Sequence, residues 1–211
     1  MAVRNLKLLD LRKMALGSLD EEVNDNHYGS LVASWINEGM QRMITESEGL
    51  EDNYTFSTVV GTRDYALPAP PTIAGDIIRL KQVLYEGRAI AESQLLNYDF
   101  FSNGTGYVDR FAIWNNKILF GPMRPSKVVP VILYFYRSPA VLVADGDTPE
   151  IPDRFRGYLA DYAAAQMLLA DGRGAEASVF MQSFDQGART YNHWARQKSR
   201  SNFKQVLQVM E

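Results

Sequence analysis

Apolar residues recur every three or four positions in the first quarter of the chain. A short stretch at residues 4–16 and a stronger one at residues 28–44 each place their apolar side chains on one helical face. In the stronger stretch these positions are Tyr28, Leu31, Val32, Trp35, Ile36, Met40, Met43 and Ile44. Gly17 and Gly49 can end the two helices. The pattern therefore predicts two amphipathic helices.

Short segments rich in β-branched and aromatic residues replace this pattern between residues 53 and 136. Gly, Pro and Asn separate them, which is typical of strands joined by turns. The clearest pair is residues 111–114 and 117–120, because the intervening Asn115-Asn116 tolerates the positive φ of a two-residue hairpin turn. Residues 77–85 and 128–136 predict further strands.

Helical spacing returns after a linker rich in Pro, Asp and Gly at residues 137–152. Two helices follow, and the short break at residues 171–174 predicts that they form an antiparallel hairpin. Helices, then strands, then helices indicate an α+β fold. We expect the N- and C-terminal helices (residues 1–50 and 151–198) to form a helical bundle with an inserted antiparallel β-sheet or hairpin region (residues 51–140). The predicted core includes Trp35, Ile36, Tyr162, Phe180 and Phe184.

Composition excludes several classes of protein. With 211 residues, of which 46% are hydrophobic and 22% charged, the chain suits one large or two small globular domains and is neither disordered nor collagen-like. No apolar run approaches the ~20 residues of a membrane-spanning helix. Charged residues at positions 10, 12 and 13 interrupt any signal-peptide pattern, so we expect folding in a reducing cytoplasm.

No motif for catalysis or cofactor binding is complete. The chain has no Cys and only two His, His27 and His193, which excludes thiolate and His-rich metal sites. The acidic segment at residues 145–150 departs from a calcium loop, since Pro149 and Arg156 occupy its fifth and twelfth positions. We therefore expect no catalytic residue, no metal and no cofactor. A carboxylate pair from this segment remains the basis of an alternative, a hydrolase.

The C-terminal end combines positive charge with an apolar stripe. From Arg189 onward there are five basic residues and one acidic residue, in a chain whose net charge is -3. Basic groups steer towards an acidic partner, and an amphipathic helix can then seat in a groove. We expect residues 199–211 to form a docking tail, although a frayed terminal helix explains the pattern equally well. The predicted partner-binding residues are Arg196, Lys198, Arg200, Phe203, Lys204, Val206, Leu207 and Met210.

The order of several local sequences resembles that of the head-to-tail adaptor (connector) proteins of tailed bacteriophages. These sequences are Trp-Ile-Asn-Glu-Gly at 35–39, Tyr-Ala-Leu-Pro at 65–68, Leu-Phe-Gly-Pro at 119–122, Leu-Tyr-Phe-Tyr-Arg-Ser-Pro at 133–139, Asp-Thr-Pro-Glu-Ile-Pro at 147–152 and Tyr-Leu-Ala-Asp-Tyr-Ala-Ala-Ala at 158–165. The resemblance covers residues 28–195. Ala69-Pro70-Pro71 departs from it, because Asp-Phe usually follows Leu-Pro in the family.

The resemblance implies a structural virion protein and no enzyme. Such adaptors form a closed ring of copies, normally a dodecamer, which docks under the portal protein, extends the DNA channel and offers the tail attachment surface. Tail or nozzle proteins would be further partners, genomic DNA would pass without specific binding, and no membrane would be involved. The expected location is the virion neck, after assembly in the host bacterial cytoplasm. Two alternatives stay open, a cell-wall or polysaccharide hydrolase and a carbohydrate- or protein-binding module of a virion.

Overall fold

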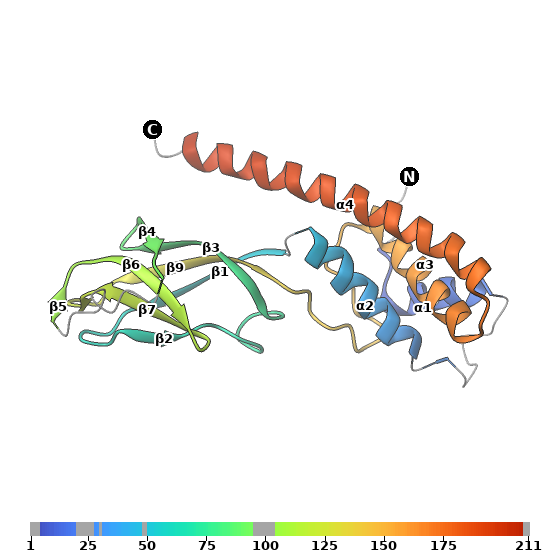
Figure 1. Ribbon diagram of the computed structural model, residues 1–211, viewed down its shortest axis with the longest axis horizontal. Helices are drawn as coiled ribbons and strands as arrows, with labels where there is room; N and C mark the ends of the chain where they lie inside the picture. Colours follow the sequence, from blue (N-terminus) through green and yellow to red (C-terminus); the bar gives the residue numbers. More distant parts are fainter. Residues whose placement is uncertain (1–4, 20–27, 30, 48–49, 95–103, 209–211) are drawn as a thin grey trace. The chain divides into compact units, whose positions relative to one another are not determined.

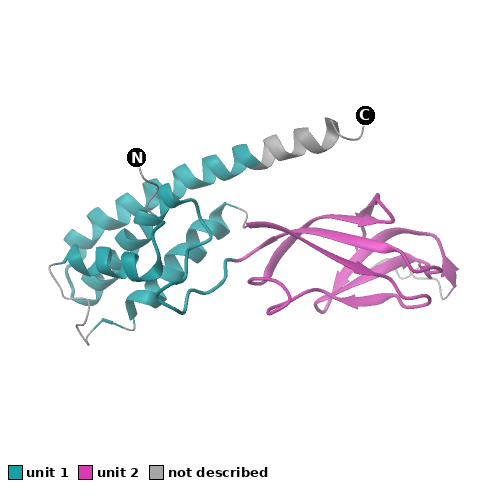
Figure 2. Ribbon diagram, turned by 180° about the vertical axis from the view of Figure 1, so that it is seen from behind, with its two compact units in different colours: residues 1–49, 139–211 teal, residues 50–138 magenta. Residues whose placement is uncertain are grey.

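A computed structural model describes residues 5–19, 28–29, 31–47, 50–94 and 104–208, with only the helical backbone for 199–208. The chain folds into two compact units (Figure 2). Residues 1–49 and 139–211 belong to a helical unit, and residues 50–138 belong to a β unit. The β unit is therefore a continuous stretch of sequence between the two halves of the helical unit.

Four helices make up the described part of the helical unit (Figure 1). They are α1 (Leu8–Gly17), α2 (Leu31–Glu46), α3 (Asp153–Ala170) and α4 (Gly174–Gln208). α3 and α4 form an antiparallel hairpin, in which the Phe155 and Tyr191 rings lie 5.3 Å apart and the Tyr162 and Phe184 rings 4.7 Å apart. The reversal occurs at Gly172, whose φ of 74° suits a residue without Cβ.

The core of the helical unit combines small and large apolar side chains. The run Ala163, Ala164 and Ala165 is buried, which lets neighbouring helices approach α3 closely. The largest fully buried side chains around it are Leu8, Leu11, Leu16, Ile36, Met40, Met43, Ile44 and Phe184. Of the core residues expected from the sequence, Ile36, Tyr162 and Phe184 are buried, whereas Trp35 and Phe180 are half-buried.

Seven strands form the main sheet of the β unit (Figure 1). Across the sheet their order is β1 (Leu50–Ser57), β9 (Pro130–Arg137), β3 (Ile77–Tyr85), β4 (Arg88–Glu92), β6 (Val108–Trp114), β7 (Lys117–Pro122) and β2 (Asp64–Ala66). β5 (Thr105–Gly106) and β8 (Arg124–Pro125) form a separate pair. The sheet curls, because Phe56 of β1 and Tyr65 of β2, its two outermost strands, have ring centroids only 5.2 Å apart.

The predicted fold class, a helical bundle with an inserted antiparallel sheet or hairpin, is wrong. The β region is a large curled sheet with its own core, which includes Val83, Phe120, Leu133 and Phe135. The sheet is also mixed, because β4 pairs in parallel with β6. A parallel pair cannot be joined by a two-residue hairpin turn, so β4 and β6 do not form a hairpin. β4 is short and mostly exposed, so its sequence carries no clear alternation.

The ionisation of Asp161 on α3 should make the stability of the α3–α4 hairpin depend on pH. Its Oδ2 accepts a hydrogen bond from the Ser183 hydroxyl of α4 at 2.6 Å. Burial raises its pKa above the ordinary value, and the Ser183 hydrogen bond offsets this in part. The folded state therefore binds the carboxyl proton of Asp161 more tightly than the unfolded state does. The free energy of unfolding consequently falls as pH rises through the folded pKa of Asp161.

Asp161→Asn should therefore raise the urea midpoint of unfolding at pH 7, and the gain should shrink as pH falls towards the ordinary pKa of Asp. The amide oxygen of Asn can still accept the Ser183 hydrogen bond. Urea titrations at pH 7 and pH 4 provide the measurement. A gain that is equal at both values would show that burial of the charge is not its cause.

Candidate partner-binding site

α4 is the element that presents most of the predicted partner-binding residues. It has 35 residues, whereas its hairpin partner α3 has 18. Phe155 in the first turn of α3 contacts Tyr191 and Trp194, with ring centroids 5.3 and 5.8 Å apart. No part of α3 remains to pack against α4 beyond this point. Residues 195–208 nevertheless continue as helix, for about 20 Å at a rise of ~1.5 Å per residue.

An aromatic cluster anchors α4 just before this extension. Tyr191 is buried, and the Arg154 guanidinium lies 5.1 Å from the centroid of the Trp194 ring. The Lys198 ammonium lies 5.4 Å from the same ring. Asn192 donates a hydrogen bond of 3.1 Å to the Glu46 carbonyl at the end of α2. These contacts hold the helix firmly as far as Trp194, so the extension starts from a fixed base.

The structure places the predicted partner-binding residues in three groups. Arg196 and Lys198 are exposed on α4. Arg200, Phe203, Lys204, Val206 and Leu207 lie on the helical backbone of the extension, where side chains are not described. Met210 lies outside the described residues. The extension thus brings all but Met210 onto one continuous helix, and their role in binding stays a prediction.

Sequence reasoning missed Arg154, which packs on Trp194 across the hairpin. The two residues are far apart in sequence, and only the register of the hairpin brings them together. This pairing could have been predicted from the sequence. If the chain reverses at Gly172 and Arg173, Phe155 comes to lie opposite Tyr191. The signal was therefore the position of the turn.

The acidic segment at residues 145–150 has structural partners in the helical unit. Asp145 forms a 2.8 Å ion pair with Arg12 of α1. Asp147 accepts the backbone N–H groups of Val143 and Ala144 at 2.7 and 2.8 Å, and these hydrogen bonds lower its pKa. Glu150 accepts the Ala140 N–H at 2.8 Å. These contacts account for the carboxylates without a catalytic role.

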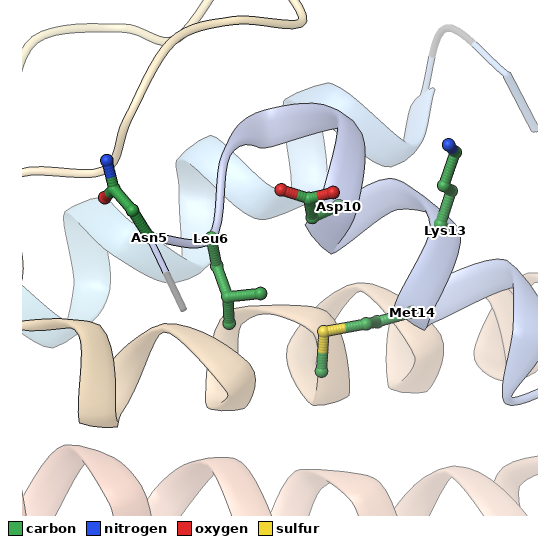
Figure 3. A pocket seen from close by; sticks show the side chains of 5 residues that line it. All are labelled: Asn5, Leu6, Asp10, Lys13 and Met14. Atoms are coloured by element: carbon green, nitrogen blue, oxygen red, sulfur yellow. The ribbon is translucent and has the colours of Figure 1, made fainter. Parts of the chain in front are cut away.

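A hollow of about 430 Å³ opens beside α1 (Figure 3). Its lining comes from one segment of the chain: Asn5, Leu6, Asp10, Lys13 and Met14. Asp10 accepts the Lys7 backbone N–H at 3.0 Å, and the Arg156 guanidinium donates to the Asn5 side chain at 2.6 Å. One carboxylate and one amine do not provide the nucleophile, base and charge-stabilising group of a catalytic site.

Metal-binding clusters are absent from the described residues, among which no three His, Asp or Glu side chains could share an ion. His193 is exposed and lies 2.9 Å from the Gln197 amide, while His27 is outside the described residues. No helix in the described ranges is long and apolar enough to cross a membrane.

The sequence model for SU10 adaptor protein matches residues 7–207, which span both units and nearly all of α4. The chain belongs to the SU10 adaptor protein family. This match confirms the predicted resemblance to phage head-to-tail adaptors, and the protein is accordingly a phage adaptor. The search of curated proteins found no match to the chain.

Proposed function

We propose that the protein forms a closed dodecameric ring that docks under the portal protein, extends the DNA channel and carries the tail attachment surface. Membership of the SU10 adaptor family over residues 7–207 supports a role between head and tail. A closed ring needs two different surfaces on each copy, so that each contact repeats around the axis. The ring would lie in the virion neck after assembly in the host cytoplasm, and DNA would pass through it without specific binding.

The C-terminal extension of α4 is the proposed portal-docking element. The observation that carries this proposal is that α4 continues as helix to Gln208, beyond Trp194, where its described ring contacts with α3 end. An isolated amphipathic helix of this length is marginal in water and gains stability when its apolar stripe is buried. Phe203, Val206 and Leu207 would supply that stripe to a groove of the portal, while the basic residues would speed the encounter.

A chain truncated after Lys198 should fold normally and fail to bind portal rings. Folding should survive because the described contacts between α3 and α4 end near Trp194, before the truncation. Binding should fail because the proposed apolar stripe is removed. Native mass spectrometry of the truncated and full-length chains, each alone and mixed with portal rings of the same phage, gives ring mass and stoichiometry.

Two matched point variants guard against an indirect effect of truncation. Leu207→Asp should reduce portal binding strongly, by about 100-fold or more, since it places a charge in the apolar stripe. Gln205→Ala, on the same helix but outside the stripe, should bind as the wild type does. Portal binding by the truncated chain at full strength would instead place the docking surface elsewhere.

A further inference from the structure

Three loops of the β unit meet at one end, where β5 lies (Figure 1). We call residues 57–63, 104–107 and 123–129 the β tip. Backbone hydrogen bonds join the loops: Gly61 N–H to the Pro125 carbonyl at 2.9 Å, Thr58 N–H to Val129 at 2.9 Å, and Arg124 N–H to Gly104 at 3.0 Å. Their side chains therefore share one surface.

The β tip exposes large apolar side chains. Val59, Val60, Val128 and Tyr107 are each between 53% and 65% exposed, and Met123 is 37% exposed. Single exposed apolar residues are normal, but several gathered on one small surface indicate a binding site.

Tyr65 holds residues 59–62 of the β tip in a fixed conformation. Its hydroxyl oxygen accepts the Val59 N–H at 2.7 Å and lies 3.1 Å from the carbonyl oxygens of Val59 and Thr62, to one of which it donates. Its ring contacts Phe56 and Phe120, so the side chain is itself fixed by packing. A loop already held in one conformation loses little conformational entropy when it binds.

The charges of the β tip select the partner. Its three segments contain Arg63, Arg124 and Lys127 and no acidic residue, in a chain of net charge -3. Contact between two tips would bring like charges together, so the tip is not complementary to itself. A partner surface with apolar residues bordered by carboxylates would match both features.

Nucleic acid fits this surface less well. The tip segments contain three cationic side chains, of which Lys127 already forms an ion pair with Glu86, and this is few for a surface that must follow a phosphate backbone. Most of the tip's large exposed apolar side chains, Val59, Val60, Val128 and Met123, offer no hydrogen bonds to phosphate.

We infer that the β tip binds an acidic, apolar surface on a tail protein. This inference rests on the proposed function, in which the other partner, the portal, is engaged by the extension of α4 in the helical unit. An adaptor must hold two different neighbours, and the β tip supplies a second, chemically different surface for that purpose.

The test uses the full-length adaptor loaded onto DNA-filled heads, mixed with tails purified from the same phage. Joined particles are counted by negative-stain electron microscopy. Val60→Asp combined with Val128→Asp should lower tail attachment at least about tenfold while portal binding and ring mass stay unchanged. Arg124→Gln should slow attachment and weaken its dependence on salt.

Val143→Asp is the matched control, because Val143 is 83% exposed and lies in the helical unit. It should leave both portal binding and tail attachment unchanged, and all variants should keep the wild-type melting temperature. Normal tail attachment by the double variant would overturn the inference. Loss of ring formation would also overturn it, because the β tip would then contact another copy of the chain. Loss of binding to a short DNA duplex, with tail attachment intact, would overturn it as well, because the β tip would then bind DNA.

The two proposals fail in different ways. If the wild-type adaptor joins heads to tails and the double variant does so equally well, only the β tip inference is wrong. If the wild-type adaptor binds neither portal rings nor tails, the proposed function is wrong and the inference falls with it.

Discussion

Replacing Phe184 by Ala should lower the free energy of unfolding of the helical unit by about 3 to 5 kcal/mol. Phe184 has no exposed surface, and its ring centroid lies 4.7 Å from that of Tyr162 on α3. The Arg42 guanidinium of α2 lies 5.4 Å from the same ring. One side chain thus joins three helices, and its removal would leave a cavity that the surrounding helices can fill only in part.

Urea unfolding followed by circular dichroism at a helix-sensitive wavelength measures this loss. Val179→Ala is the control, since Val179 lies on the same helix but is 66% exposed, and its effect should stay within about 0.5 kcal/mol. A loss below about 1 kcal/mol for Phe184→Ala would mean that the hairpin does not depend on this contact.

The helical elements could be predicted because their sequences carry periodicity and clear end signals. Apolar spacing predicts a helix at residues 28–44, which the structure has at residues 31–46, and Gly172 marks the reversal between α3 and α4. The hairpin at Asn115-Asn116 could be predicted for a similar reason, since both residues adopt the expected positive φ, 47° and 58°. In each case the signal lies within a few residues of the element that it specifies.

The sheet topology could not be predicted, because its determining contacts are distant in sequence. β1 pairs with β9, and Leu50 lies opposite Arg137. β3 pairs with both β9 and β4, with register shifts that interrupt the alternation of buried and exposed side chains. The local sequence of a strand does not predict which other strand it pairs with.

The C-terminal extension of α4 could be predicted from the sequence, whereas the β tip could not. Charge and apolar spacing make the C-terminal extension visible in the sequence from Arg196 onward. The β tip has no such signal, since Val59 and Val60 read as the end of a strand. Only the hydrogen bonds from Tyr65 and the approach of residues 123–129 show that these valines are fixed and exposed.

Gly75→Ala should destabilise the β unit by about 3 kcal/mol or more, because backbone strain and a steric clash of the added Cβ with Ser138 add together. Gly75 has a φ of 77°, which is strained for any residue with a side chain. A Cβ at this position would also lie 2.1 Å from the Ser138 carbonyl oxygen, a backbone atom that cannot move alone. The same contact region carries two hydrogen bonds, from Asp76 N–H to the Ser138 hydroxyl and from Ser138 N–H to the Asp76 carbonyl, both 2.8 Å.

These hydrogen bonds fix the start of β3 against the end of β9, so a displaced Ser138 should loosen the centre of the sheet. Gly61→Ala separates the two costs, because Gly61 has a φ of 76° but no atom within 4 Å of the added Cβ. It should lose only the ~1 to 2 kcal/mol of backbone strain. Hydrogen exchange read by mass spectrometry should show faster exchange in residues 77–85 and 130–137 for Gly75→Ala and unchanged exchange in α2 and α3. Equal effects of the two substitutions would mean that β9 moves aside freely, and that the Gly75–Ser138 contact does not hold the sheet together.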